Sequence, residues 1–202
     1  MRASSWRMLS ALLYDHVLAR GERDGMAARR SALLDGVRGR VLEVGAGTGL
    51  NVPHYPLGVD LTLTEPDRAM AARLRKRAGA VRVVDAPAEA LPFPDDAFDV
   101  VVSTLVLCTV DDPAAALAEV RRVLRPGGRL VFIEHVRAPS RPLARWQDRL
   151  AWPWRKVAAG CRCNQPTLEL LRAAGLAVTA RDDAWRGMPA LVRPLVVGEA
   201  RP

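Results

Sequence analysis

The sequence predicts a single α/β domain built around a parallel β-sheet. Short apolar segments with the character of strands alternate with helical segments along nearly all of the 202 residues. This alternation is typical of parallel strands joined by right-handed helical crossovers. A chain of this length can bury one core of that kind, and no internal repeat indicates a second domain.

Seven segments are predicted to be strands because they are short, apolar and rich in valine or leucine. In chain order they are residues 40–45, 59–65, 80–86, 98–105, 129–136, 177–185 and 191–200. The fourth segment, FDVVVSTL, is apolar almost throughout, as expected for a strand whose two faces are both covered.

Helices are predicted between and before these strands, at residues 6–35, 67–79, 112–128, 141–156 and 167–176. Gly79 closes the second helix, and Asp112 caps the third with Pro113 at its first position. The first helix is expected to break at Gly21. Its predicted apolar face consists of Leu9, Leu12, Leu13, Val17 and Met26.

The composition indicates a soluble globular protein, and a reducing cytoplasm is the expected compartment. The net charge is +8, but the arginines that supply most of it are scattered, so a nucleic-acid partner is not expected. The sequence has no apolar run of 18 residues, and its first 20 residues lack a signal-peptide cleavage site. Three cysteines are too few for a disulfide scaffold, and Cys161 and Cys163 are spaced too closely for a paired zinc site, so no metal is expected.

The segment VLEVGAGTGLN at 41–51 places three glycines directly after the first strand. Its spacing is G-x-G-x-G, whereas a dinucleotide loop has G-x-G-x-x-G. Glu43, two residues before the first glycine, is unsuited to a pyrophosphate and suited to a cationic group. Glu65 ends the second strand, where a carboxylate can accept hydrogen bonds from ribose hydroxyls. The loop therefore indicates a ligand with a ribose and an ammonium but no phosphate, and S-adenosylmethionine fits that description.

The chain resembles the class I S-adenosylmethionine-dependent methyltransferases. The segments that carry the resemblance span residues 40 to 135 and are VLEVGAGTG, LTEPD, EALPFPDDAFDVVVS and EVRRVLRPGGRLVFIEH. The resemblance implies a Rossmann-like seven-stranded sheet flanked by helices, with strand order 3-2-1-4-5-7-6 and strand seven antiparallel. It also implies that S-adenosylmethionine is bound and S-adenosylhomocysteine released.

The resemblance further implies which residues bind the cofactor. Glu43 lies near the amino group of its methionine portion, and Glu65 holds the ribose. Many relatives have an aspartate for the adenine amino group where this chain has Pro87, so the adenine is assigned to Ala88 and Glu89. The full predicted set is Tyr14, Glu43, Gly45, Ala46, Gly47, Gly49, Asn51, Glu65, Pro66, Ala88, Glu89, Thr104 and Leu105. Two interpretations of Tyr14 stay open, a lid over the cofactor and a core aromatic.

The second half of the chain is similar to the methyltransferase-like thiol S-methyltransferases of animals and their bacterial relatives. The shared residues are Leu107-Cys108, Glu134-His135-Val136, Trp146-Gln147, Gly160-Cys161 and Thr167. The animal members begin with a hydrophobic membrane-associating segment that this sequence lacks, so membrane association is not favoured.

A thiol acceptor must lose its proton, since its free pKa is about 8.5 and little thiolate exists at neutral pH. His135, at the carboxyl end of the fifth strand, is the candidate base, and a purely structural role is the equal alternative. Cys108, Cys161 and Cys163 are interpreted as buried wall residues rather than nucleophiles. His54 is expected to cap a helix after the glycine loop.

Residues 141–156, RPLARWQDRLAWPWRK, contain three tryptophans among arginines. Leu143, Trp146 and Leu150 are predicted to share one helical face, and Pro153 to break the helix. Three interpretations of this segment stay open. It forms a lid over an apolar acceptor, it forms an interfacial membrane helix, or it packs on the sheet as an ordinary helix. The lid is the favoured interpretation. The predicted single domain of residues 1–202 then consists of N-terminal lid helices at 1–35, a tryptophan-rich lid at 138–163 and the methyltransferase body.

The sequence thus predicts an enzyme that moves a methyl group from S-adenosylmethionine to a small, fairly apolar acceptor, with a thiol as the favoured acceptor. One alternative is an O- or N-methyltransferase for a secondary metabolite or a lipid headgroup. A second alternative is a non-catalytic cofactor-binding partner protein.

Overall fold

A seven-stranded sheet with the order β3-β2-β1-β4-β5-β7-β6 runs through the middle of the computed structural model, which describes residues 14–202. The strands are β1 (Arg40–Val44), β2 (Asp60–Thr64), β3 (Arg82–Val84), β4 (Phe98–Thr104), β5 (Leu124–His135), β6 (Ala177–Ala184) and β7 (Pro194–Arg201). Strands β1 to β5 pair in parallel, and β7 runs antiparallel to both β5 and β6. The predicted order and the antiparallel seventh strand are confirmed.

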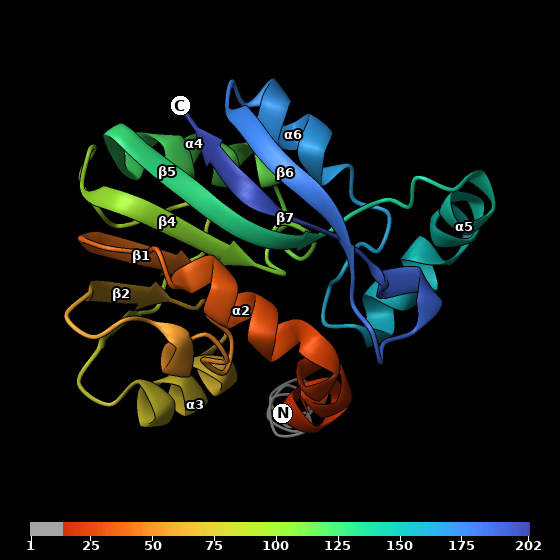
Figure 1. Cartoon of the computed structure of the whole chain (residues 1–202), viewed down its shortest axis with the longest axis horizontal. Helices are drawn as coiled ribbons and strands as arrows, with labels where there is room; N and C mark the ends of the chain where they lie inside the picture. The colour runs from red at the N-terminus through yellow and green to blue at the C-terminus, as the bar shows by residue number, and fades with distance from the viewer. Residues whose placement is uncertain (1–13) are drawn as a thin grey trace.

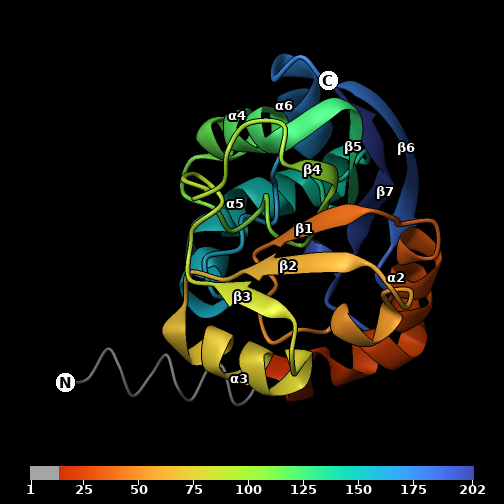
Figure 2. The ribbon, with the colours of Figure 1, turned by 90° about the vertical axis from the view of Figure 1, so that its left-hand side faces the viewer.

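Helices cover both faces of this sheet (Figures 1 and 2). They are α2 (Ala27–Leu34), α3 (Arg68–Ala78), α4 (Pro113–Val123), α5 (Arg141–Val157) and α6 (Thr167–Ala173). Leu34 of α2 packs on Val41, Val100 and Val102 of β1 and β4. The opposite face of the sheet packs against α4 and α6 in the largest hydrophobic cluster.

Two predicted helix starts and one predicted end are confirmed. The Asp67 carboxylate accepts hydrogen bonds from the backbone N–H groups of Ala69 and Met70 and so caps α3. Asp112 caps α4 in the same way. Gly79 follows the last residue of α3 with φ +61°, a conformation that favours glycine.

The break in the N-terminal helical segment lies later in the chain than predicted. Gly21 has helical φ and ψ angles, and the non-helical residues are Asp24 and Gly25, the latter with φ +125°. Gly21 serves packing instead, because a Cβ atom there would collide with the Nε1 atom of Trp185. The predicted break was wrong because this glycine makes room for a side chain rather than for a turn of the backbone.

The predicted apolar face of this segment is only partly right. Met26 is fully buried, but Val17 is 66% exposed, so it does not belong to the buried face. Leu18 takes the inward position and packs beside Trp185. Leu9, Leu12 and Leu13 lie outside the described residues.

Helix α5 departs from the prediction in two respects. It continues through Pro153 to Val157, since the proline lies on the exposed side, where water can satisfy the carbonyl it leaves free. Its buried side chains are Ala144 and Gln147, whereas Trp146 is 55% exposed and does not share the inward face. Figure 1 shows α5 at the edge of the molecule, away from the sheet. Within residues 14–202, no helix combines the length and apolar character needed to cross a membrane.

Candidate functional site

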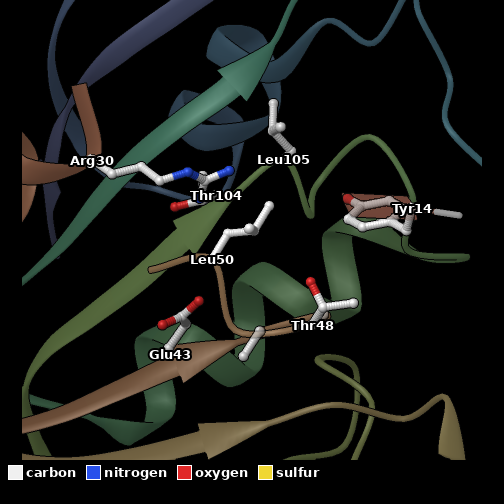
Figure 3. Close-up of a pocket in the computed structure, with 10 residues that line it drawn as sticks. Tyr14, Arg30, Glu43, Thr48, Leu50, Thr104 and Leu105 are labelled. Carbon is white, nitrogen blue, oxygen red and sulfur yellow. The ribbon is translucent and has the colours of Figure 1, made fainter. Parts of the chain in front are cut away.

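A pocket opens at the carboxyl ends of β1 and β4, beneath the N-terminal helical segment (Figure 3). It is lined by Tyr14, Arg30, Glu43, Gly45, Ala46, Gly47, Thr48, Leu50, Thr104 and Leu105. Seven of the thirteen predicted cofactor residues therefore meet in one place. This is the edge of a doubly wound sheet at which ligands bind, because the strand order reverses there.

The three glycines of the loop have left-handed backbone conformations for different reasons. Gly45, Gly47 and Gly49 have φ angles of +57°, +59° and +87°. A Cβ atom on Gly45 would lie 2.8 Å from Val106, and one on Gly49 would lie 2.8 Å from Leu74. Within the described part of the chain, a Cβ atom on Gly47 would meet nothing inside 4 Å, so this glycine faces open space in the pocket. That space is where a ligand can approach the backbone closely.

Glu43 lies at the base of the pocket and is 3% exposed. Its carboxylate accepts hydrogen bonds from Asn51 Nδ2 at 3.0 Å and from the Tyr55 hydroxyl at 2.7 Å. Burial raises the pKa of Glu43 to about 7, against the lowering effect of those hydrogen bonds and of Arg30. A cationic ligand group beside it would favour the ionised form.

Arg30 of α2 lines the same pocket and was missed by sequence reasoning. Its guanidinium is held by Glu22 at 3.0 and 3.1 Å and donates to Asn51 Oδ1 at 2.7 Å. Asn51 in turn donates to Thr104 Oγ1 at 3.0 Å, so it joins α2, β1 and β4. The chain has many arginines, and nothing in the local sequence AARRS distinguishes this one.

Glu65 follows β2 and is 7% exposed. Its carboxylate accepts hydrogen bonds from the backbone N–H of Gly47 and of Asp67, each at 2.8 Å. Burial is the main cause that raises the pKa of Glu65. This side chain therefore holds the glycine loop, and its remaining lone pairs are available for the ribose role that was predicted.

The remaining predicted cofactor residues do not line the pocket. Gly49, Asn51 and Pro66 belong to the two loops that hold it. Ala88 is 5% exposed and packs in the main core. The Glu89 carboxylate accepts from the backbone N–H of Asp111 at 2.8 Å, at the start of α4. The adenine contact by backbone at Ala88 and Glu89 stays a prediction.

His135 is buried beside Trp185, with ring centroids 5.5 Å apart, and does not line the pocket. Burial lowers its pKa to about 4, although the backbone of Pro194 and Val192 acts in the opposite direction, so the imidazole is neutral at pH 7. Its Nδ1 atom has no hydrogen-bond partner among residues 14–202.

The other two histidines play no part in the pocket lining. His54 does not cap a helix, because its Nδ1 atom lies 2.7 Å from the Ser31 hydroxyl, across the gap to α2. His16 is exposed. His135 therefore remains the one histidine of the described chain that is both buried and near the carboxyl edge of the sheet.

Glu134, next to His135, is a second buried group that sequence reasoning left without a role. Its Oε1 atom accepts from the Ser103 hydroxyl at 2.6 Å and from the Val106 backbone N–H at 3.0 Å. Burial raises its pKa to about 7 in spite of these hydrogen bonds. Glu134 thus supports the turn after β4, in which Leu105 adopts a φ of +60°.

The three cysteines gather in one small cluster with Val192, and each is buried as predicted. Cys108 and Cys161 lie together in this cluster, and the side chain of Trp154 packs against it. The Cys108 thiol donates to the Leu105 carbonyl at 3.5 Å, which links the cluster to the pocket edge. Sequence spacing could not show this meeting, because residues 108 and 161 belong to different loops.

The pocket fits the amino-acid portion of S-adenosylmethionine. A guanidinium from Arg30 and a carboxylate from Glu43 suit a ligand that bears one carboxylate and one ammonium. The open side of Gly47 leaves room for that ligand against the backbone. Among residues 14–202, no group of three or more histidine, cysteine or acidic side chains could hold a metal ion.

Comparison with known proteins identifies the family. The model for the methyltransferase domain matches residues 42–132. Human thiol S-methyltransferase TMT1B is 37% identical over 180 residues, which cover 83% of this chain and 73% of that protein. Phosphatidylethanolamine N-methyltransferase of Cereibacter sphaeroides is 34% identical over 139 residues, or 61% of this chain and 68% of that protein.

A solved structure agrees with these sequence matches. The crystal structure of an S-adenosylmethionine-dependent methyltransferase from Thermotoga maritima, described as a possible histamine N-methyltransferase, has a TM-score of 0.71. It is 27% identical, and the match covers 96% of each chain. The strand order, the glycine loop and these similarities lead to one conclusion: the chain belongs to the S-adenosylmethionine-dependent methyltransferases, in the family that includes the thiol S-methyltransferases, and is an enzyme.

Proposed function

We propose that this enzyme methylates a small, fairly apolar thiol. The observation that carries the proposal is the 37% identity to human thiol S-methyltransferase TMT1B over 83% of this chain. The match extends well beyond the cofactor-binding segment at 42–132, toward the part of the chain expected to surround the acceptor. In a sheet of this type the acceptor side is formed by the segments after β4 and β5, here Leu105 and the loop before α5.

The apolar character of the acceptor side supports an apolar substrate. Leu105 and Tyr14 line the pocket, and both pack against a hydrophobic cluster that contains Ile133 and Trp185. Burial raises the pKa of Tyr14, so its phenol stays protonated and brings no charge. An apolar wall excludes water from the reacting atoms and selects against strongly hydrated acceptors.

When bound, S-adenosylmethionine supplies an electrophilic methyl group and leaves as S-adenosylhomocysteine. The residues of the chain then have two tasks, which are to align the acceptor and to remove its proton. Arg30 and Glu43 orient the amino-acid end of the cofactor, because the guanidinium attracts its carboxylate and the Glu43 carboxylate attracts its ammonium group. His135 is the proposed proton acceptor because its Nδ1 atom has no partner within residues 14–202. Burial lowers its pKa to about 4 and so weakens it as a base, which keeps a purely structural role as the alternative.

Helix α5 is proposed to cover the acceptor through the cysteine cluster. Trp154 packs against the cluster that contains Cys161 and Cys108, and the Cys108 thiol donates to the Leu105 carbonyl at the pocket edge. Through these contacts, residues 138–163 are connected to the acceptor side of the pocket. No side chain of α5 is itself part of the described pocket lining.

N-methylation of a lipid headgroup is the second candidate function. It is favoured by the 34% identity to the phosphatidylethanolamine N-methyltransferase of Cereibacter sphaeroides. An amine acceptor also has to lose a proton, so His135 is the candidate proton acceptor for this reaction as well. The two candidates differ in the acceptor that the apolar side of the pocket admits.

The test is a labelled-methyl transfer screen over matched thiols, phenols and amines of similar size. We expect transfer to alkyl and aryl thiols to be fastest, and the Gly47→Val variant serves as the inactive control. Faster transfer to phosphatidylethanolamine or small amines would replace the proposal with the second candidate. Cofactor binding without transfer to any class would instead indicate a non-catalytic partner protein.

A further inference from the structure

Asp15 makes a set of contacts that the proposed function does not use. Its carboxylate accepts a hydrogen bond from the Thr48 hydroxyl at 2.5 Å and contacts Arg77 at 2.8 Å and Arg73 at 3.4 Å. The Asp15 side chain is 19% exposed, and Thr48 is 1% exposed. Arg77 also donates to the Thr48 carbonyl at 3.0 Å. These four residues, Asp15, Thr48, Arg73 and Arg77, form a closed polar network.

The network joins three parts of the molecule that are separate in sequence. Asp15 lies in the helical segment at 14–21, Thr48 in the glycine loop, and the two arginines in α3. The residue before Asp15 is Tyr14, which lines the pocket, and the residue before Thr48 is Gly47, whose open side faces it. The contacts therefore hold one wall of the pocket against another.

The segment that carries Tyr14 is not continuous with α2. Asp24 and Gly25 interrupt the helix with non-helical angles, so residues 14–21 are joined to α2 by a kink. On the α2 side of the kink, Arg30 binds Asn51 at the far end of the same glycine loop. The loop is thus held from α2 through Asn51 and from residues 14–21 through Thr48.

We propose that Asp15 is a positioning residue that latches the Tyr14-bearing helix over the bound cofactor. Releasing the latch leaves the α2 contact in place but frees the cover of the pocket to move about the kink. The cofactor then escapes more readily, while the groups that orient it, Arg30 and Glu43, stay where they are. The latch rests on the cofactor site of the proposed function and does not depend on which acceptor the enzyme uses.

The strength of the contacts supports such a role. Exposed ion pairs contribute little, but this carboxylate is mostly covered and receives hydrogen bonds from one hydroxyl and two guanidinium groups. Burial alone would raise the pKa of Asp15, yet hydrogen bonds from Thr48, Arg77 and Arg73 outweigh it and hold the pKa below its usual value. The carboxylate is therefore charged across the neutral range.

The experiment measures S-adenosylhomocysteine binding and dissociation for Asp15→Asn, Arg77→Gln and the double variant. Asp35→Asn is the matched control, since it makes the same change to an exposed carboxylate at the far end of α2. We expect each latch variant to release the ligand about tenfold faster, which corresponds to one or two lost charge-assisted contacts. The double variant should be no worse than the weaker-binding single variant, because both remove the same network.

A second readout needs no ligand and no turnover. Backbone amides of residues 14–21 should exchange with solvent faster in Asp15→Asn than in Asp35→Asn, with α2 unchanged. Equal dissociation rates and equal exchange in the two variants would overturn the latch. Should Asp15→Asn lose its fold, Thr48→Val removes one hydroxyl from the same network and is judged by the same criteria. Failure of the unaltered protein to bind S-adenosylhomocysteine would instead refute the cofactor site itself.

Discussion

The cofactor pocket and helix α5 satisfy their buried polar groups in different ways. In the pocket, Glu43 binds Tyr55, 12 residues away, and Glu65 binds the backbone of Gly47, 18 residues away. In α5, one buried amide, Gln147, bonds to the backbone of three separate segments, and the bond to Leu191 spans 44 residues. The two carboxylates of the pocket thus find their partners in β1, β2 and the loops that follow them, although Asn51 extends the network to Thr104, 53 residues away. The bonds of Gln147 depend on how the whole C-terminal half folds.

This difference separates the part of the molecule proposed to bind the cofactor from the part proposed to surround the acceptor. A local network can be kept by a short motif, and it serves a ligand that all members of the family share. A long-range network can be rebuilt when the surrounding loops change, which suits a site where substrates differ. We therefore expect substitutions in the pocket to alter cofactor affinity and substitutions around α5 to alter stability or acceptor use.

The largest effect is expected for Gly47→Val. At φ +59° a β-branched residue is strained, and its side chain would occupy the open space beside the loop. We expect S-adenosylmethionine affinity to fall by a factor on the order of 10³, and backbone strain of about 1–3 kcal/mol to lower the melting temperature by several degrees. Calorimetry would measure both, and normal affinity in a folded Gly47→Val variant would mean that the cofactor does not pass this glycine.

Neighbouring substitutions in α5 test the long-range network. Gln147→Ala leaves several buried backbone groups without a partner, so the free energy of unfolding should fall by about 2–4 kcal/mol. Trp146→Ala removes a larger side chain that is 55% exposed, and should cost about 1 kcal/mol or less. Urea denaturation of both variants measures the contrast. A greater loss for the tryptophan would show that its face of α5 is covered after all.

The His135→Ala variant tests whether His135 removes the proton of the acceptor. If the imidazole removes the thiol proton, turnover should fall about 10²-fold at pH 7 with cofactor affinity unchanged. The loss should shrink as pH rises past the thiol pKa, because solvent then supplies thiolate. A pH-independent loss together with a lower melting temperature would assign His135 a structural role, and a fully active variant would exclude it as the base.

The lowered pKa of His135 also leads to a prediction about stability at acidic pH. Its pKa is lowered to about 4 in the folded protein and is about 6.5 in the unfolded chain. The unfolded state therefore binds the proton first as pH falls, and the folded state loses stability between about pH 6.5 and 4. His135→Gln should reduce this acid destabilisation, which melting curves across that range would detect.

A smaller effect on cofactor binding than that of Gly47→Val is expected for Glu65→Ala, because this substitution removes one ligand partner and leaves the open space of the pocket unfilled. We expect S-adenosylmethionine binding to weaken by about 1–3 kcal/mol, as the ribose loses a charged partner. Asp60→Ala, at the other end of β2, is the control and should bind normally. Glu65→Gln keeps one acceptor oxygen and should lie between them. Unchanged affinity in a folded Glu65→Ala protein would refute the ribose assignment.

Local patterns in the sequence were sufficient to predict the elements of the sheet and the nature of the cofactor loop. Most strand and helix positions follow from apolar spacing, although residues 124–128, predicted as the end of a helix, belong to β5. The helix caps at Asp67 and Asp112 depend on hydrogen bonds to residues two and three positions away. The glycines and Glu43 could be interpreted because a short loop after a strand restricts the groups that lie beside it. The strand order came from the resemblance to a family, and the structure confirms it.

Contacts between side chains that are far apart in the sequence, in contrast, could not be predicted and are seen only in the structure. Arg30 entered the pocket, Asp15 reached Thr48, and Cys108 met Cys161, although none of these pairings has a signal in local spacing. The break assigned to Gly21 was wrong because a glycine can serve the approach of Trp185 as well as a turn. Periodicity records which face of an element is covered, whereas the choice of partner depends on the packing of segments far apart in the chain.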